Sequence, residues 1–441
     1  MTKTAIKIIP RDLLFFRDAR PMMGSSEGSG GEWPLPSVLH SSLLSAFHKR
    51  WPDIQTWENQ HHQLNAKENK KFRKGGSSSM RFGGLKTLGP FPCQQGTIFL
   101  PTPADIDSDG TVMRPIKSDS STNNLPSPLR YLVGNSCPPS KAGIERWISL
   151  GDFQRYLAGK NQKLDLASIS STAPLYSQES RPGVEIDPRT RSNRETIFYQ
   201  AQYLRLADGV SLVSWADALN SRSGESTRTN LLDELFTDQE TISLILGGQG
   251  GMAGVTRMKK PFSIFSLQSG WDNGLRVKWV LLSPACFNAG WLPGWINPPR
   301  GEKNHHQNYE PGRVMLPAVQ TPREEGERRT QWRNRARGKE PVEARLVAAR
   351  IPREIVYSGW KLQVQENDMI KALREGEHAG FGPKPTRLLI PAGSIYYFDC
   401  ADKSSAEQLV KSLHLQVKSD LWGEQGFGFG VCGSWEFNNF A

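Results

Sequence analysis

The sequence predicts an α+β protein with a sizeable core. Short β-rich runs, broken by glycine, proline and serine, alternate with a few segments of helical periodicity. No unit of about 20 to 50 residues recurs along the chain, which argues against a solenoid or a propeller. At 441 residues the chain has room for about two to four domains, and its 37% hydrophobic content is typical of folded globular proteins.

A strand, a glycine-rich loop and an amphipathic helix open the chain. Residues Ile6–Pro10 predict the first strand, and Leu13–Phe16 extend it beyond a charged pair. Four glycines follow between Met22 and Trp33. The next stretch predicts a helix that ends near Arg50, because its apolar residues recur on one helical face: Leu39, Leu43, Leu44 and Phe47.

Two basic insertions interrupt the predicted elements, at residues 58–89 and 299–343. Both are rich in lysine or arginine and poor in apolar anchors. Such segments bury too little apolar surface to offset their ordering entropy, so we expect them to order only on a partner. Between the insertions, Tyr199–Leu206 and Leu275–Ser283 alternate like half-buried strands.

The C-terminal hundred residues predict a strand, helix, loop and strand. Thr386–Cys400 contains two strand-like runs, and Ser404–Val417 predicts a helix for which Ser404 is the expected N-cap. A glycine-rich loop at 423–430 then leads into a closing strand, Val431–Phe437. This order is typical of a split βαβ, ferredoxin-like domain.

Charge and cysteine content narrow the class of protein. The formal net charge is +11 and the pI is about 9.4, which favours anionic partners, with nucleic acid the commonest. Charged residues interrupt the N-terminus where a signal peptide needs an apolar core, and no window is apolar enough to predict a membrane span. Five scattered cysteines, none in a C-x-x-C pair, predict neither a disulfide framework nor a zinc site. We therefore expect a cytoplasmic protein.

Two glycine clusters allow a close approach of the backbone to a ligand. Gly428–Gly433 formally fits G-x-G-x-x-G but opens a strand, and Ile245–Val255 lacks the G-K-[ST] ending of a phosphate-binding loop. Arg257 and Lys259 follow the second cluster, so we expect it to lie near a phosphate. Tight turns made only for packing are the alternative for both loops.

No catalytic constellation is visible. His40 and His48 are predicted on or near the first helix, opposite its apolar face, where a histidine could act as general base in metal-independent RNA cleavage. The sequence offers them no second catalytic group. Aromatic residues beside glycine or arginine, Phe427, Phe429 and Trp332, are candidates for stacking unpaired bases.

Several segments, in order along the chain, resemble the third-subunit family of the Cmr effector, the type III-B CRISPR ribonucleoprotein, within the RAMP superfamily. They recur from one end of the chain to the other: FFRDARPMMG, WPLPSVLHSSLLSAF, RPGVEIDPRTRSNRETIFYQAQYLRL, ILGGQGGMAGV, IPAGSIYYFD and GEQGFGFG. The resemblance implies two tandem ferredoxin-like (RRM/RAMP-type) domains with basic loop insertions, which we expect at residues 1–270 and 271–441.

The resemblance also implies a function. It implies a non-catalytic subunit, without cofactor or metal, that binds the 5′ repeat-derived tag of the guide RNA. The implied partners are the large polymerase-like subunit and the RAMP backbone subunit, with target RNA engaged indirectly and no membrane. The RNA-binding residues implied are Arg17, Arg20, Ser37, His40, Gly247, Gly248, Gly250, Gly426, Phe427, Gly428, Phe429 and Gly430.

Two other functions stay open at this point. The chain could be a RAMP endoribonuclease that processes precursor guide RNA with His40 or His48 as general base. It could also be chiefly a scaffold whose glycine-rich loops hold the large subunit.

Overall fold

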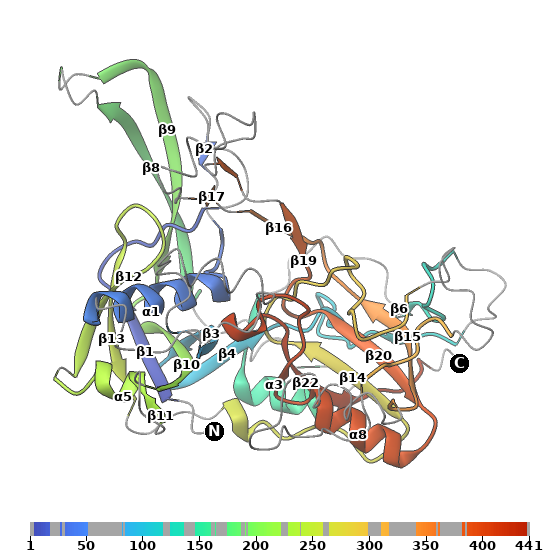
Figure 1. Cartoon of the computed structure of the whole chain (residues 1–441). Coiled ribbons are helices and arrows are strands. Elements are labelled where there is room, and N and C mark those ends of the chain that lie inside the picture. Colours follow the sequence, from blue (N-terminus) through green and yellow to red (C-terminus); the bar gives the residue numbers. More distant parts are fainter. Residues whose placement is uncertain are drawn as a thin grey trace, which may run out of the picture.

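Two lobes, each built around an antiparallel sheet, make up the computed structural model (Figure 1). The chain is of mixed α/β type, rich in sheet and with few helices. The structure describes residues 4–17, 27–28, 31–51, 82, 84–117, 124–135, 146–159, 164, 174–186, 190, 193–221, 228–238, 240–258, 264–298, 310–316, 341–358, 360–361, 382–383 and 386–438.

The first lobe contains an eight-stranded sheet in the order β12-β13-β1-β10-β3-β4-β7, with β11 paired to β10. Neighbouring strands on this path run antiparallel. The strands are β1 (Thr4–Pro10), β3 (Leu85–Gln94), β4 (Thr97–Pro101), β7 (Trp147–Ser149), β10 (Val210–Ser221), β11 (Arg228–Asn230), β12 (Thr241–Ile245) and β13 (Met252–Arg257).

Helices α1 (Pro36–Arg50) and α5 (Leu231–Leu235) cover one face of this sheet. Proline at the first turn of α1 suits a position whose amide has no partner within the helix. Leu39, Leu43 and Phe47 are fully buried against strands β1, β10 and β13, as their spacing predicts. The predicted first strand and first helix are thus confirmed.

The second lobe contains a five-stranded sheet in the order β15-β20-β14-β22-β21, packed against helix α8 (Lys403–Leu413). Its strands are β14 (Arg276–Leu281), β15 (Ala344–Arg350), β20 (Ile395–Cys400), β21 (Gln416–Val417) and β22 (Phe429–Ser434). The side chain of Asp402 caps α8 by accepting the Ser405 amide at 2.7 Å. The predicted N-cap, Ser404, was therefore wrong by two positions, because the side chain of Asp402, the residue before α8, takes this role.

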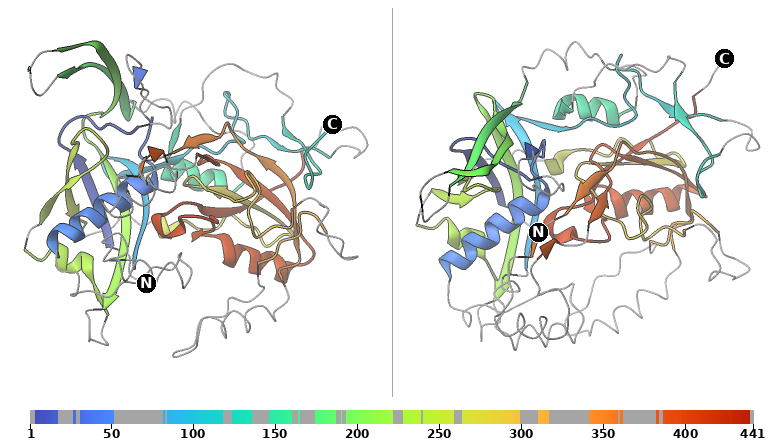
Figure 2. Two further views of the ribbon diagram at one scale, coloured as in Figure 1. Left: turned by 45° about the horizontal axis from the view of Figure 1, so that its top comes forward. Right: turned by 90° about the horizontal axis from the view of Figure 1, so that it is seen from above.

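The two lobes share one hydrophobic core. Trp215 of the first sheet and Phe429 of the second both belong to it, and helix α3 (Leu150–Leu157) adds Phe153. Each of these three side chains is 0–1% exposed. Figure 2 shows the two sheets beside each other with α3 above their junction. Because burial of this apolar surface is the main stabilising term, the lobes hold each other in place.

Smaller ribbons extend from this body. The longest, β8 (Tyr176–Ile186) with β9 (Asn193–Leu206), projects well away from both lobes (Figure 1). The other short elements are β2 (Glu27–Gly28), β5 (Arg114–Pro115), β6 (Val133–Gly134), β16 (Ile355–Tyr357), β17 (Trp360–Lys361), β18 (Gly382–Pro383), β19 (Arg387–Leu389) and the 3-10 turns η2 (Ile264–Ser266) and η3 (Gly423–Gln425). No helix in the described part of the chain is long and apolar enough to cross a membrane.

The predicted insertions are wrong at their edges. Residues 85–89 belong to strand β3, and residues 310–316 place Val314 in the second core with no exposed surface. Leu13–Phe16 makes only isolated bridges, to Leu204 and Gly248, and forms no continuous strand. The secondary structure at these positions depends on pairing with residues far away in the sequence, which local composition does not predict.

His414 links the end of α8 to strand β22 and gives the fold a pH dependence. Its Nε2 donates to the Leu267 carbonyl at 3.0 Å, and its Nδ1 accepts the Cys432 amide at 3.2 Å. The bond that Nδ1 accepts requires the neutral ring, and burial lowers the pKa of His414 below its usual value. The stabilisation is therefore complete above about pH 6.5 and is lost as the pH falls through the lowered pKa.

We expect wild type to lose more stability than His414→Gln between pH 7.5 and 5. The difference in slope should not exceed about 1.4 kcal/mol per pH unit, the limit for one proton. Urea titrations of both proteins at several pH values measure it. Parallel stability curves for the two proteins would contradict this role of His414.

Candidate nucleic-acid interface

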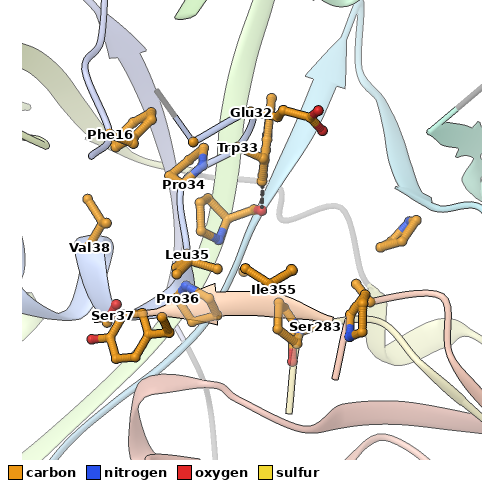
Figure 3. Close-up of a pocket in the computed structure, with 18 of the residues that line it drawn as sticks. Phe16, Glu32, Trp33, Pro34, Leu35, Pro36, Ser37, Val38, Ser283 and Ile355 are labelled. Carbon is orange, nitrogen blue, oxygen red and sulfur yellow. Dashed lines mark hydrogen bonds between the residues drawn. The ribbon is translucent and has the colours of Figure 1, made fainter. Parts of the chain in front are cut away.

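A cleft of about 1580 Å³ opens between the two lobes. The first lobe contributes residues 31–38, at the start of α1, together with residues 89–91 and 247–248. The second lobe contributes residues 282–284 and the segment 350–358, which includes β16. Figure 3 shows Leu35, which precedes α1, close to Ile355 of β16, so segments distant in sequence form facing walls.

Four of the residues predicted to bind RNA line this cleft: Arg17, Ser37, Gly247 and Gly248. Arg17 is exposed and forms no ion pair with another described residue. Gly248 donates its amide to the Phe15 carbonyl at 2.8 Å, which fixes the glycine turn to the segment that carries Arg17. A Cβ on Gly247 would lie 2.5 Å from the Phe15 carbonyl oxygen, and its φ is +83°. The glycine is required for this internal contact, which presents Arg17 to the cleft.

Other predicted residues do not reach the cleft. Gly250 is exposed at the turn between β12 and β13 and does not line it. Arg257 forms an ion pair with Asp233 at 2.8 Å. Arg20, Lys259 and the stacking candidate Trp332 lie outside the described residues.

The C-terminal glycine-rich loop requires a correction. Residues Gly426–Gly430 are all buried, and the rings of Phe427 and Phe429 have no exposed surface. A Cβ on Gly426 would lie 2.5 Å from the Thr87 carbonyl oxygen, and a Cβ on Gly428 would lie 2.4 Å from the Ser419 amide nitrogen. These glycines make close contacts within the protein, so the loop offers neither backbone nor ring face to RNA, and predicting RNA contacts for these five residues was wrong.

The buried loop instead supports one wall of the cleft. Phe427 packs against Tyr357 of β16, with ring centroids 6.3 Å apart, and against Trp422 at 5.6 Å. Leu35 and Ile355, on opposite sides of the cleft, pack on the same small core. The loop therefore helps to determine the width of the cleft.

The two candidate catalytic histidines do not line the cleft. His40 is 8% exposed, with its Nε2 3.4 Å from the Leu85 carbonyl oxygen, so its predicted orientation away from the apolar face was wrong. The position of His40 outside the cleft gives no support to RNA contact by its ring. His48 packs edge-on against Phe82, at 5.1 Å between ring centroids. No group of three or more potential metal ligands occurs among the described residues.

The structure adds residues that the sequence did not reveal. Trp33 donates its Nε1–H to the Pro90 carbonyl at 3.0 Å (Figure 3). It packs on Trp147, with ring centroids 4.8 Å apart. Arg146 forms an ion pair with Glu32 at the rim. Arg353 is exposed and lies on the second-lobe wall. The W-P-L-P run before α1 could have indicated Trp33, but no local signal marks Arg353.

The cleft combines a mainly apolar surface with a few positive groups. The start of α1 opens into it, where the helix dipole favours anions. Arg17 and Arg353, from different lobes, add two cations that no described carboxylate neutralises. Proline and aromatic side chains such as Pro34 and Phe16 supply flat apolar faces. Such a lining suits an unpaired nucleotide strand, whose phosphates need cations and whose bases need apolar contacts.

The chain is similar to known proteins in sequence and in structure. A family model described as "CRISPR-associated protein (Cas_Cmr3)" matches residues 6–435. A chain of a type III-B Cmr-beta complex bound to cognate target RNA is similar in structure, with 13% identity and a TM-score of 0.40 over 96% of this chain and 95% of that chain. A chain of a Csm3-Csm4 subcomplex from a type III-A complex shows 11% identity and a TM-score of 0.32, over 91% and 94%. No curated protein matches the sequence significantly.

Proposed function

Because this chain belongs to the Cas_Cmr3 family of CRISPR-associated proteins, we propose that it binds the 5′ repeat-derived tag of the guide RNA in the cleft between its lobes. Membership of the family makes it a subunit of a type III-B CRISPR effector complex. The role that we propose within that complex is non-catalytic. The expected neighbours are the large polymerase-like subunit and the first RAMP backbone subunit, with the target RNA reached through the guide.

The observation that carries the proposal is the position of Arg17. The Gly247–Gly248 turn holds the segment that bears it, and Ser37 at the start of α1 lines the same cleft. Arginine beside a helix N-terminus supports contact with a phosphate of the RNA backbone. The apolar walls support contact with unstacked bases, which is how proteins recognise single-stranded RNA of fixed sequence.

We expect Arg17→Ala to weaken binding of a labelled tag RNA several-fold and to reduce the salt slope by about 1, the value for one phosphate contact. Fluorescence anisotropy across a salt series measures both quantities. Arg50→Ala is the matched control, because Arg50 is an exposed arginine at the other end of α1, paired with Asp238 at 2.6 Å. An affinity and slope equal to those of wild type would remove Arg17 from the RNA interface.

We also infer that each lobe is a ferredoxin-like unit. In the first lobe the chain order β1, α1, β3, β10, α5, β13 is combined with the sheet order β13-β1-β10-β3. The second sheet has the matching order β22-β14-β20-β15, with α8 between β20 and β22. These orders support a split βαβ arrangement in both lobes, which would place the predicted boundary near residue 270.

The endoribonuclease alternative gains no support from the site. His40 is buried on α1, and neither His40 nor His48 lines the cleft. Incubation of the protein with precursor guide RNA in EDTA tests this alternative. A discrete cut that His40→Ala or His48→Ala abolishes would replace the binding proposal by a catalytic one.

A further inference from the structure

Strand β12 forms a free edge of the first sheet. It pairs with β13 from Thr241↔Thr256 to Ile245↔Met252 and is the last strand of the sheet order. Within the described part of the chain, no backbone hydrogen bond reaches its other side. Figures 1 and 2 show β12 and β13 at the margin of the first lobe.

This edge lacks the features that usually prevent strand pairing. Its sequence, TISLI, contains no charged residue, proline or glycine. Proteins commonly protect a free edge with lysine, proline, a bulge or a covering element, because its unpaired amides and carbonyls can pair with another chain. Among the described residues none occupies the free side of β12, so its amides and carbonyls there can pair with an extended polypeptide.

The surface beside the edge is apolar and exposed. Ile245 is 60% exposed and Ile9 of β1 is 48% exposed. Ile9, Gly254 and Ser243 face the same side in neighbouring strands, as their register shows. Gly254, the partner of Ile9 on β13, carries no side chain, so it adds no bulk to the surface beside Ile9.

Two cations, Arg11 and Lys7, lie close to these residues. Arg11 donates to the Ser243 hydroxyl at 2.7 Å, which leaves its charge uncompensated. Lys7 lies on the same face of β1 as Ile9, and neither cation forms an ion pair with any described residue. An occupant with an acidic side chain would complement these charges.

We propose that β12 is extended by a strand from a protein neighbour in the effector complex, with an apolar side chain over Ile245 and Ile9 and an acidic one near Arg11. The inference rests on the proposed function for the identity of the complex. A protein fits better than RNA, because alternating amide donors and carbonyl acceptors along a strand match another peptide backbone. Ile245 also lines the cleft, so the added strand would lie beside the bound RNA.

Hydrogen exchange tests the inference without RNA. The full chain is mixed in turn with the purified large subunit and the purified backbone subunit of the same complex. In the free chain every second amide of β12 should exchange fast, and one of the two subunits should slow this exchange at least about tenfold. Unchanged exchange with both subunits would overturn the proposal, and so would protection by RNA alone or by self-association of the chain.

Substitutions provide a second readout. Arg11→Glu and Ile245→Lys should each weaken association with that subunit by about tenfold, measured by interferometry. Met315→Lys is the control, because Met315 is 48% exposed and lies in the second lobe. Wild-type affinity of both edge variants would sink the proposal. Since these measurements contain no RNA, their failure is distinguishable from a failure of tag binding, which the Arg17 variant tests separately.

Discussion

Replacing Asp105 by alanine is expected to destabilise the folded chain by about 3–5 kcal/mol, the range for removing one partner of a buried ion pair. Asp105 is 1% exposed, and its Oδ2 lies 3.6 Å from Nζ of Lys278. It also accepts hydrogen bonds from the hydroxyls of Tyr156, at 2.8 and 2.9 Å, and Tyr397, at 3.1 Å. The variant would leave a buried ammonium and two buried hydroxyls without this partner.

This network joins both lobes, which is why its loss should unfold the whole chain. Asp105 follows β4 of the first sheet, Tyr156 belongs to α3, and Lys278 lies on β14 of the second sheet. Burial lowers the pKa of Lys278, so its charge depends on the facing carboxylate. Burial, together with the charge of Asp105, raises the pKa of Tyr156 and Tyr397 and keeps both hydroxyls protonated as donors.

Urea denaturation measures the effect, with Asp109→Ala as the matched control. Asp109 lies in the same loop but is exposed, so its loss should cost less than about 1 kcal/mol. Adding Lys278→Met to Asp105→Ala should recover part of the lost stability, because the uncompensated charge is removed. An Asp105→Ala protein as stable as wild type would show that the network does not hold the lobes together.

Gly428→Val is expected to cost about 3 kcal/mol or more, through strain and overpacking together. Gly428 has a φ of +74°, and a Cβ there would lie 2.4 Å from the Ser419 amide nitrogen and 2.8 Å from the Ser419 Cβ. The Gly428 amide also donates to the Pro284 carbonyl at 2.8 Å, which anchors the loop. Valine can relieve the clash only by moving this backbone away from residues that form the cleft wall.

Gly250→Val is the control that separates backbone strain from steric clash in the Gly428→Val variant. Gly250 has a φ of +69° but no atom within 4 Å of a built Cβ, so its replacement should cost only about 1–2 kcal/mol. Thermal unfolding and tag-RNA binding should be measured for both variants. Wild-type stability of Gly428→Val would contradict the close contacts described above.

The local sequence pattern correctly predicted helix α1. The spacing of Leu39, Leu43 and Phe47 predicted α1, because a helical stripe buries itself on any apolar surface. The same pattern predicted the wrong environment for His40. Strand β3 packs against α1 and buries His40 as well as the apolar side chains of the helix. The glycines at 426–430 predicted that the backbone comes close to another group, but the sequence did not show whether that group is RNA or another part of the protein.

By itself the sequence determined the mixed α/β class, the basic character, the family and the two glycine turns, since composition and local pattern carry these properties. Only the tertiary structure decided that one turn presents Arg17 while the other is buried, and that Arg17 and Arg353 line the same cleft. The physical reason is that the burial of a loop, and the placement of two side chains in one cleft, depend on contacts between residues hundreds of positions apart. Gly426 against Thr87 is such a contact, and no local propensity encodes it.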